Sequence, residues 1–136
     1  MLIVDTGVIV AAADRNDPHH KTCAALLESA DGPLITSPLV IAEAAYLINR
    51  ELGPVTEQAL YTAIVDDALI VESLAHADWV RVRELVGRYQ DLPLGGTDAS
   101  VVALAERFDA HRVATLDRRH FTVVRPSHVD AFLLVP

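Results

Sequence analysis

The sequence is poor in cysteine and in long apolar runs. Cys23 is the only cysteine among 136 residues, which excludes an intramolecular disulfide framework and a cysteine-rich zinc site. This fits a reducing compartment, so we expect a cytoplasmic protein. No apolar run reaches the roughly 18 residues that a membrane helix needs, and no basic segment precedes the first apolar run. We therefore expect neither secretion nor membrane insertion.

Basic residues are also scarce. The chain has 11 of them against 19 acidic residues, which gives a net charge of −8, and Lys21 is the only lysine. Such an overall charge does not favour contact with a polyanion. Most of the arginines lie from Arg81 onward. A nucleic acid would therefore have to be bound by a local arginine surface or through bound cations.

What the chain does contain is an alternation of short apolar runs with longer helical patterns. The hydrophobic fraction of 51% and the length indicate one folded domain over residues 1–136. Strands are predicted at residues 2–4, 34–36, 69–71 and 113–116, with short edge strands at 123–124 and within 131–135. Helices are predicted at residues 8–13, 18–30, 39–52, 57–68, 78–90 and 98–109.

Polar residues mark the expected helix starts. Asp17, Ser37, Thr56 and Thr97 each precede a helical pattern and are predicted N-caps. In the helix over 78–90, apolar residues at helical spacing predict a buried stripe of Trp79, Val82, Leu85, Val86 and Tyr89. Strands separated by helices imply a mostly parallel sheet covered on both faces, that is, a three-layer α/β fold.

Four acids stand where local propensity does not require them. Asp5 and Asp117 follow the first and fourth predicted strands, and Asp98 lies in the first turn of the helix that leads into the fourth strand. Glu43 is the only charged residue in a largely apolar segment from Leu39 to Ile48. Because ligands of parallel α/β sheets bind beyond the carboxyl ends of the strands, these acids could meet in one crevice.

Each acid also has an ordinary explanation. Asp98 suits the first turn of a helix, Asp5 and Asp117 suit turns after strands, and Glu43 could pair with an arginine or extend into solvent. Four segments delivering a carboxylate to one sheet edge make the joint interpretation stronger. Two carboxylates about 5 Å apart repel by roughly 3 kcal/mol at an effective dielectric near 20, so such a cluster requires protonation or a cation. Oxygen ligands select Mg²⁺ or Mn²⁺, which can activate water for phosphodiester hydrolysis.

At this point four segments resemble the motif blocks of PIN-domain ribonucleases, in particular the VapC-type toxins of bacterial toxin–antitoxin pairs. These segments are LIVDTG (2–7), SPLVIAE (37–43), DLPLGGTDA (91–99) and TLDRRHF (115–121). The resemblance implies a three-layer PIN-like domain with a central, mostly parallel sheet of about five strands. It also implies a catalytic acidic quartet of Asp5, Glu43, Asp98 and Asp117, which would hold Mg²⁺ or Mn²⁺ while water attacks an RNA phosphate.

The resemblance further implies partners and accessory residues. The substrate would be RNA, with tRNA or rRNA as candidates, and a small cognate antitoxin would lie in a groove near the site of a homodimer. Thr6 matches a hydroxyl position that helps to order the site, with Thr97 beside Asp98 as a further accessory. Asp91 is either an outer acid or a loop cap. Arg118, with Arg119 and His120, either contacts a phosphate or an antitoxin carboxylate, or forms a solvated turn.

Two other functions remain open from the residues. A receiver-like phosphoacceptor module also carries acids at the carboxyl ends of parallel strands, but it normally needs a lysine on a late strand, and Lys21 lies near the start. A PIN-like scaffold could bind RNA or a protein without cutting. The intact set of four acids argues against that scaffold.

Overall fold

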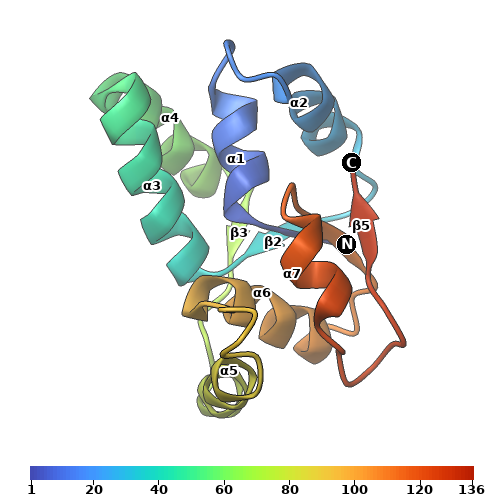
Figure 1. The fold of residues 1–136 in the computed structure, drawn as a ribbon. Helices are drawn as coiled ribbons and strands as arrows, with labels where there is room; N and C mark the ends of the chain where they lie inside the picture. Colours follow the sequence, from blue (N-terminus) through green and yellow to red (C-terminus); the bar gives the residue numbers. More distant parts are fainter.

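A five-stranded sheet runs through the centre of the computed structural model, which describes residues 1–136 (Figure 1). Every neighbouring pair of strands is parallel. The spatial order is β3-β2-β1-β4-β5. The strands are β1 (Leu2–Val4), β2 (Leu34–Thr36), β3 (Ile70–Val71), β4 (Arg112–Ala114) and β5 (Leu133–Val135). The predicted α/β class and the parallel sheet are confirmed.

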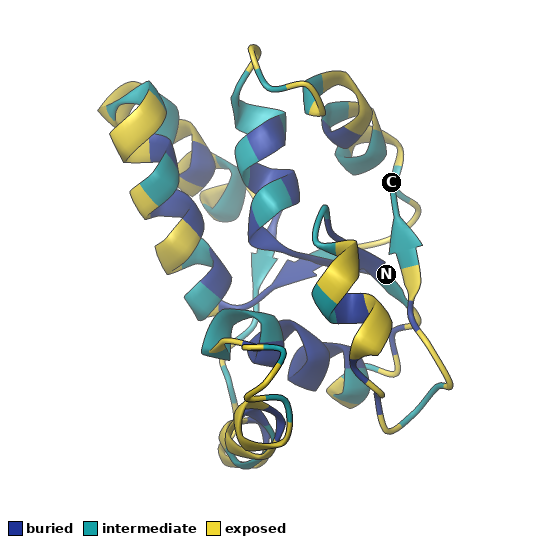
Figure 2. Ribbon diagram, viewed as in Figure 1, coloured by how far each residue is buried: buried dark blue, intermediate teal, exposed yellow.

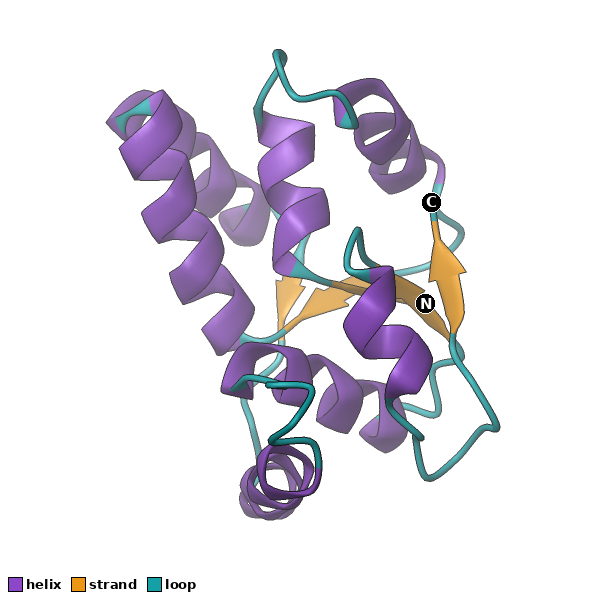
Figure 3. Ribbon diagram, in the orientation of Figure 1, coloured by secondary structure: helices purple, strands orange, loops and turns teal.

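Seven helices connect and cover these strands (Figure 3). Their bounds are α1 (Thr6–Ala13), α2 (His20–Ser29), α3 (Pro38–Leu52), α4 (Pro54–Val65), α5 (His76–Arg88), α6 (Gly96–Arg107) and α7 (Arg118–Val123). None of them combines the length and the apolar character that crossing a membrane requires.

The helices form a layer on each face of the sheet. Figure 1 shows α1 and α2 above the sheet, and α6 below it with α5 outside α6. Helix α3 packs against both α1 and α6 and so joins the two layers. The core lies between these layers, where β1 is completely buried and α6 is buried at every residue from Ala99 to Ala105 (Figure 2). Burial on both faces explains why the strands are continuous apolar runs.

One predicted helix start is confirmed and another is shifted. The Ser37 hydroxyl accepts a hydrogen bond from the backbone N–H of Val40 at 3.1 Å, so Ser37 is the N-cap of α3 as predicted. Asp17 instead accepts from the backbone N–H of His19 at 2.7 Å and closes a turn, and α2 begins only at His20. The prediction of a helix from residue 18 was therefore two residues early.

Glycines begin two helices for which threonine caps were predicted. Gly53, with a positive φ of 86°, is the N-cap of α4, so Thr56 lies inside that helix. Gly95 is the N-cap of α6, so Thr97 also lies inside its helix. Glycine adopts positive φ without steric cost, which allows α3 and α4 to join with almost no connecting loop.

Two further predictions were wrong. The segment with Val123, predicted as an edge strand, ends helix α7 instead, because Asp117 caps that helix and Phe121 anchors it in the core at 2% exposure. In α5, Trp79 and Val86 are exposed rather than part of the buried stripe. The buried face of this helix is narrower than its apolar pattern suggested.

Candidate active site

The topology of the sheet brings four acids to one edge. Asp5 follows β1 directly, Glu43 lies on the helix after β2, and Asp117 comes three residues after β4 ends at Ala114. Asp98 lies in the first turn of α6, which leads into β4. A helix that leads back to a parallel strand runs opposite to the strands, so its N-terminus lies at their carboxyl ends.

A cavity of about 480 Å³ opens at this edge. Its lining residues are Asp5, Thr6, Gly7, Glu43, Asp98, Leu116 and Asp117. The four acids proposed from the sequence therefore surround one space, although they come from four separate segments. Their assignment as ligands stays a prediction.

Asp5 is the most firmly held of the four. It is buried at 5% exposure and is the N-cap of α1. Its Oδ1 accepts a hydrogen bond from the backbone N–H of Thr6 at 2.8 Å, and its Oδ2 accepts from the Thr115 hydroxyl at 2.7 Å. Both carboxylate oxygens are thereby fixed in orientation.

The environment of Asp5 works against its negative charge. Burial raises the pKa of Asp5 from 3.8 to about 6, and the nearby charges of Asp98 and Glu43 add to the increase. The hydrogen bonds from Thr115 and Thr6 act in the opposite direction and do not cancel the effect of burial. A carboxylate held in this state gains from the approach of a cation.

Glu43 is oriented by a hydroxyl and by the position of its helix. The Thr6 hydroxyl donates to Glu43 Oε2 at 2.7 Å, so Thr6 contacts one of the four acids directly. The Ser37 and Ser100 hydroxyls are 2.6 Å apart in a fully buried pair, which links the start of α3 to the first turns of α6. This contact fixes the helix that carries Glu43 relative to the helix that carries Asp98.

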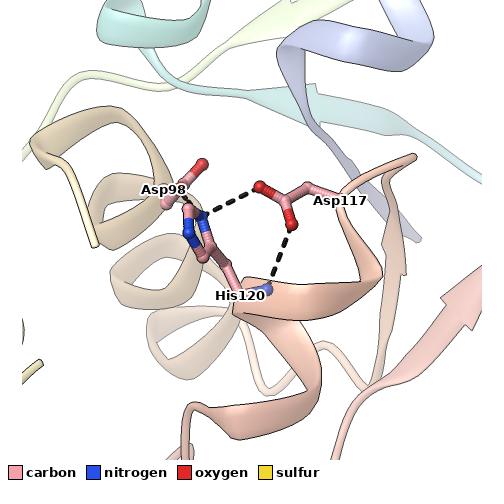
Figure 4. A group of neighbouring side chains, drawn as sticks. All are labelled: Asp98, Asp117 and His120. Atoms are coloured by element: carbon pink, nitrogen blue, oxygen red, sulfur yellow. Dashed lines mark hydrogen bonds and ion pairs between the residues drawn. The ribbon is translucent and has the colours of Figure 1, made fainter. Parts of the chain in front are cut away.

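Asp98, Asp117 and His120 form the tightest group in the site (Figure 4). His120 Nδ1 lies 2.8 Å from Asp98 Oδ2 and 2.9 Å from Asp117 Oδ2. The other Asp117 oxygen accepts the backbone N–H of His120 at 3.0 Å and caps α7. One potential ligand atom from each of the three residues lies within 4.8 Å of the other two. Figure 4 shows the imidazole ring pointing between the two carboxylates.

The charge on Asp98 is also disfavoured. Burial raises its pKa above the ordinary value of 3.8, and the charges of Asp117 and Glu43 raise it further, whereas the contact with His120 lowers it. Two of the four acids therefore carry an electrostatic cost. The donor set of carboxylate oxygens and one imidazole nitrogen fits a divalent cation, which would remove that cost.

The accessory residues predicted from the sequence differ in their placement. The Thr97 carbonyl accepts a hydrogen bond from the Ser100 hydroxyl at 2.6 Å, so Thr97 contributes backbone rather than a side-chain contact here. Asp91 is exposed and is not among the residues that line the acidic cavity. Arg118 is exposed and donates to the carbonyl of Pro136, the last residue of the chain.

Two residues of the site were not identified as such from the sequence. Thr115 donates to Asp5 and accepts the backbone N–H of Asp117 at 3.0 Å, so one hydroxyl joins two acids. The Thr-x-Asp spacing was the available signal, because an Asx- or Thr-type turn often bonds two residues along the chain. The sequence made His120 a candidate contact to a phosphate or an antitoxin carboxylate, a candidate general acid or part of a solvated turn, but not a neighbour of Asp98. Its spacing of three residues from the N-cap Asp117 was the sign that both face one side.

Comparisons with known proteins agree with this geometry. A family model for the PIN domain matches residues 2–125. Ribonuclease VapC26 of Mycobacterium tuberculosis is 32% identical over 135 residues, which covers 99% of this chain and all of that protein.

Solved structures share the fold. VapC20 of Mycobacterium tuberculosis, described as a Sarcin-Ricin loop cleaving toxin, superimposes with a TM-score of 0.82 at 21% identity, covering 96% of this chain and 99% of that one. FitAcB from Neisseria gonorrhoeae gives a TM-score of 0.66 at 15% identity, and the match covers 100% of this chain and 97% of that one. VapBC2 from Rickettsia felis, solved with a DNA fragment of its promoter, gives a TM-score of 0.67 at 16% identity. That match covers 98% of this chain and 96% of that one.

Proposed function

The chain belongs to the PIN-domain family, and on that premise we propose that it is a metal-dependent endoribonuclease that acts as the toxin of a toxin–antitoxin pair. The observation that carries the proposal is the cavity lined by Asp5, Glu43, Asp98 and Asp117. The near full-length similarity to a curated ribonuclease supports the reaction class.

The residues of the site have separable roles in this proposal. Asp98 and Asp117 would hold a divalent ion, Mg²⁺ or Mn²⁺, with Asp5 and Glu43 completing its surroundings. When bound, such an ion orients water, lowers its pKa and offsets the charge of a phosphate. The Thr115 and Thr6 contacts keep Asp5 from rotating. Rigid ligands matter because small misplacements of reacting groups cost large factors in rate.

The substrate in this proposal is a structured RNA, with tRNA and rRNA as the candidates. VapC20 is described as cleaving the Sarcin-Ricin loop, which makes an rRNA loop a reasonable first target. With a net charge of −8, the chain would not attract RNA through its overall field. Arg119, exposed in the first turn of α7 beside Asp117, is a suitable local contact for a phosphate.

The partner in this proposal is a small antitoxin, as the resemblance to VapC-type toxins implies. A second cavity of about 490 Å³ lies among α1, α2 and α4 and is almost wholly apolar. Ile9, Leu27, Leu60 and Ala63 are among its lining residues. An amphipathic antitoxin segment could bury its apolar face there. Ala59 also lines this cavity and is exposed, so an Ala59→Arg variant should lose antitoxin binding in a pull-down and keep its ribonuclease activity.

We also propose that the chain forms a homodimer, as expected for the family. Exposed aromatic residues support this, since Tyr46 is 64% exposed and Trp79 is 49% exposed. Aromatic residues are enriched in protein–protein interfaces. Light scattering of the purified chain measures the mass directly, and a single mass near 14.7 kDa at micromolar concentration would contradict the homodimer.

Cleavage of purified RNA tests the enzymatic proposal. The full chain should cut tRNA or rRNA in Mg²⁺ or Mn²⁺, and EDTA should stop the reaction. Asp98→Asn should lower the rate by at least about 100-fold, because an ion ligand is lost. Asp130→Asn is the matched control, since Asp130 is exposed and does not line the acidic cavity. RNA binding without cutting by the wild-type chain would support the non-catalytic scaffold instead.

A further inference from the structure

The position of His120 is unusual for a histidine that serves only as a hydrogen-bond donor. Its Nδ1 faces two carboxylate oxygens, Asp98 Oδ2 at 2.8 Å and Asp117 Oδ2 at 2.9 Å. A ring nitrogen carries at most one hydrogen, so it cannot donate a well-directed bond to both oxygens. At least one of these two close contacts is therefore not a well-directed hydrogen bond from the ring.

The spacing of these atoms suits a metal ion. Neighbouring ligands of an octahedral ion with bonds of about 2.1 Å lie about 3.0 Å apart, and opposite ligands about 4.2 Å apart. The two nitrogen–oxygen distances are close to the neighbouring value. The two carboxylate oxygens lie within 4.8 Å of each other, a limit that allows either arrangement.

We propose that His120 Nδ1 is a direct ligand of the divalent ion, together with Asp98 and Asp117, and that this nitrogen makes the site prefer Mn²⁺ to Mg²⁺. The inference rests on the proposed function for the presence of an ion. Mg²⁺ binds almost entirely through oxygen. Transition-metal ions accept imidazole nitrogen, with affinity rising from Mn²⁺ toward Cu²⁺. An all-carboxylate site would discriminate less between the two ions, because carboxylate oxygen suits both.

The imidazole of His120 can be replaced without removing the contacts that hold α7 in place. The cap of α7 uses the backbone N–H of His120, which donates to Asp117 Oδ1 regardless of the side chain. Phe121, at 2% exposure, anchors the helix separately. His120→Asn keeps a polar atom near the position of Nδ1 but replaces nitrogen coordination by a carboxamide. His111→Asn is the matched control, because His111 is exposed and is outside the acidic group.

Electron paramagnetic resonance of Mn²⁺ bound to the full chain reports nitrogen ligands independently of activity. In the wild-type chain and the His111 variant, the electron spin of Mn²⁺ should couple to one imidazole nitrogen. Labelling the histidines with ¹⁵N should change the size of that coupling. His120→Asn should abolish it. In calorimetry, the ratio of Mn²⁺ to Mg²⁺ affinity should fall by about tenfold in His120→Asn and stay unchanged in His111→Asn.

The outcomes separate this inference from the proposed function. If Mn²⁺ binds the wild-type chain, is lost in Asp98→Asn and shows no nitrogen coupling, the role of His120 is refuted and the ribonuclease proposal stands. If neither ion binds at all, both proposals fail. If His120→Asn does not fold, as judged by circular dichroism, His120→Ala and the labelled wild-type chain replace it, and the absence of nitrogen coupling in that wild-type chain still refutes the inference.

Discussion

Replacing Asp5 by asparagine should stabilise the metal-free protein while abolishing its activity. Asp5 is buried, and both of its oxygens accept hydrogen bonds, from the Thr6 N–H and the Thr115 hydroxyl. Asparagine has nearly the same shape and keeps one acceptor for Thr6. Its amide group would face Thr115, whose hydroxyl would lose its acceptor at a cost of about 1 kcal/mol.

The Asp5→Asn variant gains stability because it lacks a buried negative charge that the fold disfavours. The pKa of Asp5 is raised from 3.8 to about 6, and a shift of about 2 units corresponds to about 3 kcal/mol. The folded protein binds this proton more tightly than the unfolded chain. The penalty is therefore absent well below pH 3.8, grows as the pH rises, and is complete above about pH 6.

The net effect is a stabilisation of Asp5→Asn by about 2 kcal/mol at pH 7.5, after the lost hydrogen bond is subtracted. Near pH 4.5 only about 1 kcal/mol of the charge penalty is present. The lost hydrogen bond offsets it, so wild type and variant should have nearly equal free energies of unfolding. Urea unfolding in EDTA at both pH values measures this difference. Because other acids titrate in both proteins, only the difference between them reports on Asp5.

Saturation with Mn²⁺ should make the wild-type chain more stable than Asp5→Asn, the reverse of the order in EDTA. An ion at 100 times its dissociation constant stabilises the folded state by about 2.7 kcal/mol, and the wild-type chain should gain this while Asp5→Asn gains little. An Asp5→Asn variant that is less stable than wild type in EDTA at pH 7.5, or a difference that does not change with pH, would refute the electrostatic reasoning.

Three further substitutions test the site and the fold that supports it. Thr115→Val keeps the buried shape but removes the hydroxyl that donates to Asp5, so it should cost about 1–2 kcal/mol in urea unfolding and weaken Mn²⁺ binding in calorimetry. Arg107→Met removes the partner that lies 2.6 Å from the buried carboxylate of Asp78, so it should cost about 3 kcal/mol; adding Asp78→Asn should recover part of the loss, and no recovery would contradict this explanation. Phe121→Ala should cost about 3–5 kcal/mol and should also weaken Mn²⁺ binding, because α7 carries His120 and is capped by Asp117.

The acids of the site could be anticipated from the sequence because each follows a strand or opens a helix at a predictable place. Asp5 directly follows β1, and Ser37 caps α3 as predicted, so Glu43 falls one to two turns into its helix. These inferences depend on local patterns alone. The parallel sheet then determines that such positions share one edge.

His120 could not be assigned in the same way. Its neighbours Arg118 and Arg119 are exposed, and the β-branched residues after Phe121 suggested a strand. Only the packing of Phe121 into the core turns this segment into a helix and brings the imidazole toward Asp98, which lies 22 residues earlier in the chain. Long-range contacts of this kind leave no periodic signal in a single sequence.

The order of the strands explains why the cavity forms where it does. From β1 the chain builds β2 and β3 on one side, and then crosses to place β4 and β5 on the other. The connections after β1 and β4 therefore diverge, and the crevice between them is where open α/β sheets bind ligands. Asp5 and Asp117 stand on the two sides of this crevice. Thr115, which accepts the backbone N–H of Asp117 on its own side, donates its hydroxyl across the crevice to Asp5. Because strand order is a property of the whole fold, a swap of β4 with β5 would keep every local motif and still separate these two acids.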